Sequence, residues 1–369
     1  MPLSRVRPEE YEDLLKKKVN LVCSQMEQFA LPTPHICPSQ PLGFRLRAEF
    51  RIWHEGETVD FVMFRNDQPR VPVRIQEFPI VDERIQHAMR CLRDILNSNE
   101  FLRRKLFQVE FITSLAGDLL ITLIYHRKLD KQWEKAAQLL NEELRANALT
   151  ASIIGRSRKQ KLVIGKDYIE EVLAIHGTDY RYRQYEQAFS QPNGLVNIKM
   201  IEWACSQSAT LVGDLLELYC GNGNFTLPLA QYFEAVVATE LSKTSIRAAR
   251  ENIVENGAKN VHLIRLSAEE VTQAINEERV FRRLKELPKP LHDFDLNTLF
   301  VDPPRAGLDD HTVTMATRFP WIIYISCNPN TLVGNLHTLH KSHSIEQFAL
   351  FDQFPYTDHM ECGVLLNRR

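Results

Sequence analysis

The feature that most constrains the fold is a regular alternation of short apolar segments with helical segments after about residue 190. The apolar segments have the length and composition of buried strands, and their alternation with helices predicts a parallel, doubly wound α/β sheet. In such a sheet the ligand site lies at the carboxyl ends of the strands, where the winding reverses. The predicted strands cover residues 213–219, 235–240, 261–265, 296–301 and 321–326.

The first half of the chain has a different pattern. Between residues 45 and 53 apolar and charged residues alternate, which predicts a strand with a basic face formed by Arg45, Arg47 and Arg51. We therefore expect an N-terminal α+β domain over residues 1–190 and a C-terminal Rossmann-like domain over residues 191–369. The other elements predicted in the first domain are helices at 8–29, 82–97 and 131–147, and strands at 58–64, 105–113, 118–126, 151–155 and 162–164.

Composition limits the classes of partner. The 369 residues include 45 Lys and Arg against 47 Asp and Glu, a net charge of −2, so any nucleic-acid contact must be a local basic patch. No apolar run approaches the roughly 20 residues that span a bilayer, and the first residues lack a secretory apolar segment, so we expect a cytoplasmic protein. Seven scattered cysteines without a CxxC pair predict reduced thiols and neither a metal nor an iron–sulfur cluster.

The first strand of the second half runs into a turn with two glycines, Gly221 and Gly223. Glycines at this spacing let the backbone turn tightly and approach a ligand. The dinucleotide fingerprint has a third Gly or Ala where this chain has Thr226, so the turn favours a ligand without a pyrophosphate. Glu240 ends the second strand, where its carboxylate could accept hydrogen bonds from ribose hydroxyls. A structural turn beside a surface carboxylate is the alternative.

Three further strand ends carry reactive or rigid groups. Asp302 follows the fourth strand, and two prolines after it fix the backbone at the sheet edge. Cys327 follows the fifth strand, before a predicted helix whose dipole favours the thiolate. Glu361 precedes a final apolar strand, where burial of a carboxylate is costly unless it is paired or reactive. A packing thiol and an exposed carboxylate are the structural alternatives, but for Cys327 the polar neighbours and the edge shared with Asp302 favour a chemical role.

Four segments resemble the S-adenosylmethionine-dependent RNA uracil-5-methyltransferases. They are GNGNFTLPLA at 221–230, FVDPPRAGLD at 300–309, YISCNPNTL at 324–332 and FDQFPYTDHMECGVLL at 351–366. In the first half RAEFRIWH, KLFQ and FSQPN extend the resemblance to the branch that forms ribothymidine in the T loop of tRNA. Related ribosomal RNA enzymes usually carry a cysteine cluster and an N-terminal β-barrel; this sequence shows neither pattern, which favours the tRNA branch.

This resemblance implies a covalent mechanism with S-adenosylmethionine as methyl donor. Cys327 would add to C6 of uracil, C5 would take the methyl group, and Glu361 would remove the C5 proton as general base before Cys327 is released. Asp302 would be a further catalytic residue, and the target nucleotide would have to leave its stack. The resemblance assigns the cofactor site to Gln191, Tyr219, Gly221, Asn224, Glu240 and Asp302.

The same resemblance makes the first domain the RNA-recognition domain. The basic strand face, the cations at 156–161 and the basic, aromatic segment at 180–185 suit phosphate contacts and base stacking, although ordinary solvated surfaces have the same composition. The expected partners are the T arm of tRNA and transfer-messenger RNA, and we expect a monomer. The implied RNA-contacting residues are Arg51, Phe107, His126, Phe189 and Arg305.

Three other functions remain open from the residues alone. The same chemistry could act on ribosomal RNA, since the first domain and not the catalytic motifs would choose the substrate. The chain could instead be an RNA-binding or RNA-folding module, against which Cys327 and Glu361 argue. A nicotinamide-dependent oxidoreductase shares the Rossmann-like pattern, but Thr226 and the motifs around Asp302 and Cys327 disfavour it.

Overall fold

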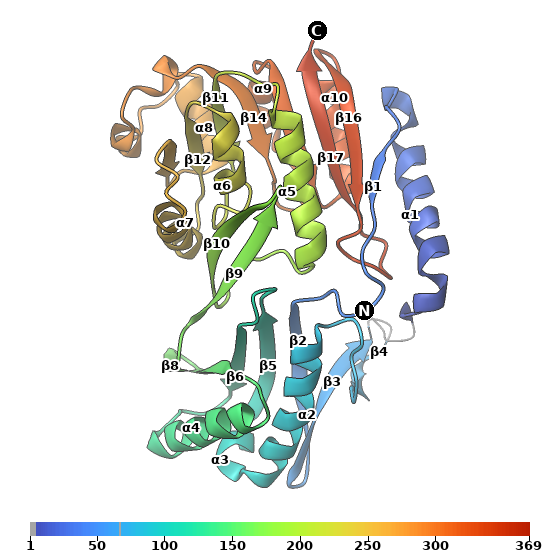
Figure 1. Ribbon diagram of the computed structural model, residues 1–369, viewed down its shortest axis with the longest axis vertical. Coiled ribbons are helices and arrows are strands. Elements are labelled where there is room, and N and C mark those ends of the chain that lie inside the picture. Colours follow the sequence, from blue (N-terminus) through green and yellow to red (C-terminus); the bar gives the residue numbers. More distant parts are fainter. Residues whose placement is uncertain (1–4, 66–67) are drawn as a thin grey trace. The chain divides into compact units, whose positions relative to one another are not determined.

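The computed structural model describes residues 5–65 and 68–369. The chain forms two compact units that are interleaved along the sequence (Figure 1). Gln40–Val172 and Gln184–Gly194 make up most of the first unit, whereas Glu9–Ser39, Leu173–Arg183 and Leu195–Arg369 form the second. This division differs from the predicted single boundary near residue 190, because the opening helix packs in the second unit.

The second unit contains an eight-stranded sheet in the order β1-β16-β17-β15-β14-β11-β12-β13. The five predicted strands pair in parallel with one another, and the winding reverses between β11 and β14. β17 runs antiparallel between β15 and β16, and β1 joins the edge beside β16. The strands are β1 (His35–Cys37), β11 (Asp214–Leu218), β12 (Val236–Thr239), β13 (Val261–Ile264), β14 (Leu296–Val301), β15 (Trp321–Ser326), β16 (His343–Phe351) and β17 (Glu361–Arg368).

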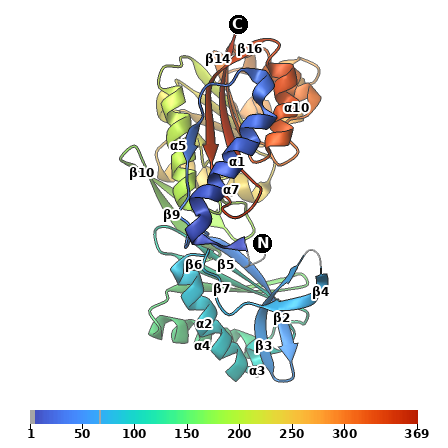
Figure 2. The same cartoon turned by 90° about the vertical axis from the view of Figure 1, so that its right-hand side faces the viewer.

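Helices cover both faces of this sheet. Figure 2 shows α1 and α10 on one face and α5 on the other. Side chains of α8 and α9 belong to the same buried cluster as those of α1 and α10, which places all four helices on one face. The helices are α1 (Tyr11–Gln25), α5 (Gly194–Ser208), α6 (Thr226–Leu229), α7 (Lys243–Glu255), α8 (Ala268–Ile275), α9 (Asp310–Ala316) and α10 (Pro329–Leu339).

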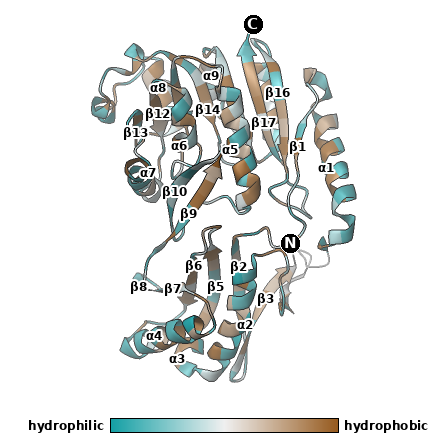
Figure 3. Cartoon of the chain, in the orientation of Figure 1, coloured by the Kyte–Doolittle hydropathy of each residue, from teal (hydrophilic) through white to brown (hydrophobic). Residues whose placement is uncertain are grey.

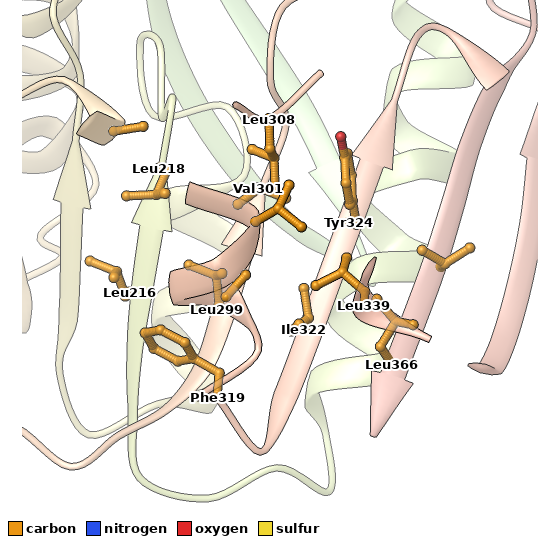
Figure 4. Close-up of a cluster of buried hydrophobic side chains, with 14 of the residues drawn as sticks. Leu216, Leu218, Leu299, Val301, Leu308, Phe319, Ile322, Tyr324, Leu339 and Leu366 are labelled. Atoms are coloured by element: carbon orange, nitrogen blue, oxygen red, sulfur yellow. The ribbon is translucent and has the colours of Figure 1, made fainter. Parts of the chain in front are cut away.

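The core of the second unit is built on the central strands. Leu216 and Leu299 from neighbouring strands are fully buried, and they pack in one cluster with Phe319 and Leu339 (Figure 4). Hydropathy follows this burial, because the central strands are mainly apolar and the helices carry polar stripes (Figure 3). Each large buried apolar side chain contributes on the order of 2 kcal/mol, so the sheet is a firm support for the loops at its edge.

The first unit contains a seven-stranded sheet in the order β4-β3-β2-β5-β6-β7-β8. Its strand pairs are antiparallel except β6 and β7, which are connected through α4. The helices α2 and α4 begin at the capping residues Asp82 and Asp130 and contact strands of this sheet. The elements are β2 (Arg47–Glu55), β3 (Thr58–Arg65), β4 (Gln68–Arg74), α2 (Glu83–Ser98), α3 (Glu100–Arg103), β5 (Leu106–Thr113), β6 (Leu119–Tyr125), α4 (Lys131–Ala146), β7 (Ala151–Ser157) and β8 (Gln160–Ile164).

Most predicted elements are confirmed, including the predicted alternation in β2. The sequence did not predict β4, nor the two-stranded sheet of β9 (Tyr168–Ile175) and β10 (Thr178–Tyr185). It also missed β1, since the prolines around residues 32–41 predicted a loop. Within residues 5–65 and 68–369, no helix is long and apolar enough to cross a membrane.

Candidate active site

The turn after β11 has an unusual backbone. Tyr219, Gly221 and Gly223 have φ values of 62°, 58° and 89°. The left-handed conformation costs a residue with a side chain, such as Tyr219, about 1–2 kcal/mol, and strain of this kind is concentrated at functional sites. A Cβ atom on Gly221 would meet no atom within 4 Å, so there is open space beside the turn. The backbone therefore fits a ligand-binding loop.

Asn224 is held by a side chain from another element. The amides of Asn224 and Asn197 on α5 exchange two hydrogen bonds of 2.9 Å. The backbone oxygen of Asn224 also accepts a hydrogen bond of 3.1 Å from the Tyr182 hydroxyl. These contacts fix the second half of the turn, and each amide keeps an N–H and a lone pair for a ligand.

Two carboxyl groups flank the turn. Glu240 accepts hydrogen bonds from the backbone N–H groups of Gly221, Leu241 and Ser242 at 3.1, 2.8 and 2.6 Å, which closes the turn and leaves lone pairs for further donors. Glu217 is buried, and its Oε2 has no hydrogen-bond partner among the described residues. Burial raises the pKa of Glu217 to about 8. A buried, unpaired carboxyl group of this kind is typical of a functional site.

The sheet brings Cys327 and Glu361 together. The last antiparallel pair of β15 and β17 joins Ser326 to Cys362, so the next residues, Cys327 and Glu361, lie side by side. Asp302 follows β14, the strand next to β15. The three predicted catalytic residues thus lie at one edge of the sheet, beside the switch point.

Burial, and for Glu361 a neighbouring carboxyl group, raises the pKa values of the acidic groups at this edge. Burial raises the pKa of Asp302 to about 7, and burial together with Asp302 raises the pKa of Glu361 well above its usual value. Burial and these two carboxyl groups raise the pKa of Cys327 to about 12. The prediction that the helix dipole favours the Cys327 thiolate is therefore wrong for the protein without substrate. The Cys327 thiol is therefore protonated at neutral pH, and the raised pKa of Glu361 favours its protonated form.

Arg305 opposes this effect. Its guanidinium charge lowers the pKa of both Cys327 and Glu361. Its Nη2 lies 2.9 Å from Nε2 of His359, a residue whose own pKa is lowered by burial and by Arg305. The neutral imidazole can accept a hydrogen bond from the guanidinium. Arg305 is thus placed to stabilise negative charge on the reactive groups, besides its predicted contact with RNA.

Side chains at the start of α10 tie the Asp302 loop to the Cys327 loop. The backbone oxygen of Arg305 accepts hydrogen bonds from Asn328 Nδ2 at 3.1 Å and Thr331 Oγ1 at 3.4 Å. Asn335 accepts a hydrogen bond from the backbone N–H of Leu308 at 3.0 Å and another from the Tyr324 hydroxyl at 2.7 Å. These contacts fix the spacing between the nucleophile and the acidic groups.

Helix α1 supports the segment that leads to Glu361. Asp352 is buried and accepts hydrogen bonds from Tyr11 at 2.9 Å and Lys18 at 2.5 Å. Lys18 also donates to the backbone oxygen of Phe354 at 3.1 Å. No sequence signal pointed to this support, because the partners are more than 300 residues apart.

The first unit presents a stack of side chains on β2, β5 and the end of β6. Phe107 lies at a register shift between β5 and β6, and such a bulge redirects a side chain. Its ring stacks on exposed His126 with centroids 4.1 Å apart, and the Arg51 guanidinium lies 3.9 Å from the Phe107 centroid. We call Arg51, Phe107 and His126 the ring stack. The structure therefore brings three of the predicted RNA-contacting residues together.

Other predicted RNA contacts are used inside the protein. Arg45 and Arg47 donate to the backbone oxygens of Arg47 and Ala188, at 2.7 and 2.8 Å. Arg156 and Lys161 form ion pairs with buried Glu186. The three tyrosines of residues 180–185 are buried, so they do not offer faces for stacking.

Phe189 and Gln191 lie in the last segment of the first unit. The Phe189 side chain is 74% exposed, which is unusual for a large aromatic residue and suits contact with a base. Gln191 Oε1 is buried without a partner among the described residues. Both keep free contact groups, as their predicted roles require.

Comparison with known proteins decides the family. A family model described as tRNA (Uracil-5-)-methyltransferase matches residues 10–369. This chain belongs to the tRNA (uracil-5-)-methyltransferase family. The predicted resemblance is therefore confirmed.

Relatives of this tRNA (uracil-5-)-methyltransferase family member align over the whole chain. The tRNA/tmRNA (uracil-C(5))-methyltransferase of Azotobacter vinelandii is 52% identical, with all of both chains covered. That of Aromatoleum aromaticum is 50% identical, covering 100% of this chain and 98% of the relative. A Pyrococcus abyssi tRNA (uracil-54, C5)-methyltransferase structure in complex with S-adenosyl-L-homocysteine has a TM-score of 0.73 at 19% identity, covering 96% of this chain and 83% of that one. This likeness confirms the predicted α/β fold class.

Several residues at the site of this family member had no signal in the sequence analysis. Asn197, Asn335 and Lys18 act through contacts with distant segments. Among the residues described, no group of three or more His, Cys, Asp or Glu side chains could hold a metal ion.

Proposed function

We propose that this protein transfers the methyl group of S-adenosylmethionine to C5 of the T-loop uridine of tRNA, and to the equivalent uridine of transfer-messenger RNA, as a cytoplasmic monomer. The observation that carries this function is the placement of Cys327 beside Glu361 and near Asp302, at the sheet edge that also bears the ligand-binding turn. Relatives of equal length named for this reaction support the choice of substrate.

The residues of the turn fit S-adenosylmethionine. Open space borders Gly221, Glu240 keeps lone pairs for the ribose hydroxyls, and buried Glu217 offers an unpaired oxygen. When bound, this cofactor supplies an electrophilic methyl group. The proposed binding residues are Gln191, Tyr219, Gly221, Asn224, Glu240 and Asp302.

Cys327 acts as the nucleophile in this proposal. Its sulfur bonds to C6 of uracil after losing its proton, which makes C5 electron-rich enough to accept a methyl group. Because the thiol is protonated in the protein alone, substrate binding must favour the thiolate, and Arg305 contributes by lowering the Cys327 pKa. This requirement limits thiolate formation to the complex with RNA.

Glu361 acts as the general base. After methylation it accepts the proton from C5, the C5–H electron pair forms the C5–C6 double bond, and the bond between C6 and Cys327 breaks. A carboxylate with a raised pKa is a stronger base than an ordinary glutamate, and Asp302 contributes to that raised pKa. The carboxyl group must be ionised before this step, which Arg305 favours.

The ring stack and Phe189 supply the proposed RNA contacts of the first unit. The exposed imidazole and the guanidinium, which cover the Phe107 ring, form a platform for bases that have left their stack. Exposed Phe189 adds a second aromatic face. Arg305 would contact the RNA in the second unit.

The test is methyl transfer from labelled S-adenosylmethionine to unmodified RNAs, followed by nucleoside analysis. Unmodified tRNA, a transfer-messenger RNA fragment and a ribosomal RNA fragment are compared. We expect 5-methyluridine at the T-loop position of the first two RNAs. Product on ribosomal RNA alone would overturn the substrate assignment, and no product on any RNA would overturn the proposed activity.

A further inference from the structure

A second basic surface lies in the second unit, away from Cys327 and Glu361. It combines the exposed face of α7 with the short helical segment Arg282–Glu286. We call it the α7 basic surface. Its exposed cations are Lys243, Arg247, Arg250, Arg282, Arg283 and Lys285.

Four of these cations, Lys243, Arg247, Arg250 and Arg283, line a groove of about 430 Å³. Arg282 and Lys285 line a second hollow, which shares Arg283 and Glu286 with the groove. Arg265, which follows β13, lines the groove and donates a hydrogen bond of 2.9 Å to the backbone oxygen of Leu241. Arg283 in turn donates to the Arg265 backbone oxygen at 3.0 Å. The groove also contains two carboxylates, Glu251 and Glu286, fewer than its cations. In a chain with net charge −2, such a local excess of positive charge is distinctive.

Four of the cations have no carboxylate within ion-pair distance among the described residues, since the ion pairs here join Arg247 to Glu251 and Arg250 to Glu286. The four are Lys243, Arg282, Arg283 and Lys285, of which Arg283 donates to a backbone oxygen. Lys243 also occupies the first turn of α7, which contains no acidic residue. Positive charge near a helix N-terminus is electrostatically unfavourable, so folding of α7 does not explain the lysine. A bound anion would offset the repulsion at this surface.

The surface shares the sheet edge with the reactive groups but lies well apart from them. β13 is four strands from β15 in the sheet order, which corresponds to about 19 Å at the usual strand spacing. A phosphate at the α7 basic surface therefore belongs to a nucleotide other than the target. The groove-lining apolar residue, Ile246, is buried, so the surface offers charge and no aromatic face for a base.

We propose that the α7 basic surface binds the phosphodiester backbone of the substrate RNA at phosphates remote from the target uridine. The identity of that RNA rests on the proposed function. Cations spread over a helix face suit a chain of phosphates, and contacts of this kind position the RNA without reading its bases.

The test is the salt dependence of tRNA affinity in a variant that carries Lys243→Gln, Arg282→Gln and Lys285→Gln. Each phosphate contact contributes about 0.7–0.9 to the slope of log affinity against log salt concentration. We expect the slope to fall by about two and the dissociation constant at low salt to rise about tenfold or more. S-adenosylmethionine affinity and the rate at saturating RNA should not change.

A matched control carries Lys16→Gln, Lys17→Gln and Lys341→Gln, which remove the same charge from exposed positions elsewhere in the second unit. Equal slopes for the two triple variants would overturn the proposal, because only net charge would then matter. Failure of the proposed function has a different result: the unaltered protein would form no 5-methyluridine. A reduced slope in that case would still establish an RNA contact at this surface.

Discussion

Buried carboxyl groups in the two units differ in whether their oxygens have hydrogen-bond or ion-pair partners. In the first unit, Glu186 pairs with Arg156 and Lys161, and Glu171 accepts hydrogen bonds from backbone N–H groups, including that of Leu115. In the second unit, Glu217 and Glu361 each have a buried oxygen without a partner among the described residues. Satisfied carboxyl groups stabilise a structure, whereas unsatisfied ones are retained for chemistry.

The two units also differ in the groups that they offer to a ligand. The first unit exposes Phe189 and the ring stack, groups that gain from contact with bases. At the reactive edge of the second unit, burial instead raises the pKa values of the carboxyl groups Asp302 and Glu361. The comparison predicts that substitutions at the reactive edge of the second unit change the rate of methyl transfer, and that substitutions in the ring stack change RNA affinity.

The largest expected effect is that of Cys327→Ala. Loss of the nucleophile should lower the methyl-transfer rate about 10⁴-fold or more while leaving S-adenosylmethionine affinity unchanged. Single-turnover methyl transfer and calorimetry measure the two quantities. Cys91→Ala, at a partly exposed cysteine of the first unit, is the matched control and should remain active. Full activity of Cys327→Ala would refute the nucleophile assignment.

Glu361→Gln should lower turnover about 10²- to 10⁴-fold. Because methylation precedes proton removal, a covalent protein–RNA adduct should accumulate and migrate as a slower band in a denaturing gel. Glu346→Gln, at an exposed position on β16, should form no such excess. An inactive Glu361→Gln protein without adduct would assign this residue to an earlier step.

Phe107→Ala should raise the dissociation constant for unmodified tRNA by about 10- to 100-fold, because His126 and Arg51 lose the ring that holds them in the stack and the platform for a base is lost. S-adenosylmethionine affinity should stay constant. Phe101→Ala removes another exposed phenylalanine from the first unit and serves as control. If both variants bind tRNA equally, the ring stack has no role in recognition.

Arg51→Ala should weaken tRNA binding about 3- to 5-fold, since an exposed cation over a ring contributes modestly. Filter binding at two salt concentrations measures the loss. Unchanged affinity would remove Arg51 from the recognition surface and leave Phe107 and His126 as its members.

The smallest effect concerns stability and pH. The pKa of Glu217 is about 8 in the folded protein and near 4.5 ordinarily, so its contribution to stability is present at low pH and is lost as pH rises through 8. The wild-type melting temperature should therefore fall between pH 6 and pH 9, and Glu217→Gln should reduce this fall by about 3 °C. Glu234→Gln, at an exposed carboxylate, should leave the fall unchanged.

Local patterns predicted much of the fold and the positions of the site residues. Alternation of strands and helices predicted the five parallel strands, and the strand ends predicted that Asp302 and Cys327 share an edge. Glu361 was predicted only to precede the final strand, and the antiparallel pairing of β17 with β15 brings it to that edge. These predictions succeeded because they depend on periodicity and on the direction of parallel strands.

Features that depend on contacts between distant segments could not be predicted. The strand β1 has only three residues and is defined by pairing with β16, more than 300 positions away. The Cys327 pKa depends on burial and on the carboxyl groups of Glu361 and Asp302, which come from distant segments of the chain. The register shift at Phe107 likewise arises from pairing with β6, and no residue type in the local sequence indicates it.

The interleaving of the two units along the sequence also limits how recombination can change such a protein during evolution. Segments of the first unit are separated by Leu173–Arg183, which belongs to the second, while Glu9–Ser39 precedes most of the first unit and packs in the second. A single genetic crossover would therefore transfer parts of both units and disrupt at least one core. New RNA preferences are more accessible through point substitutions on the outer surfaces of β2 and β5 than through the exchange of whole segments.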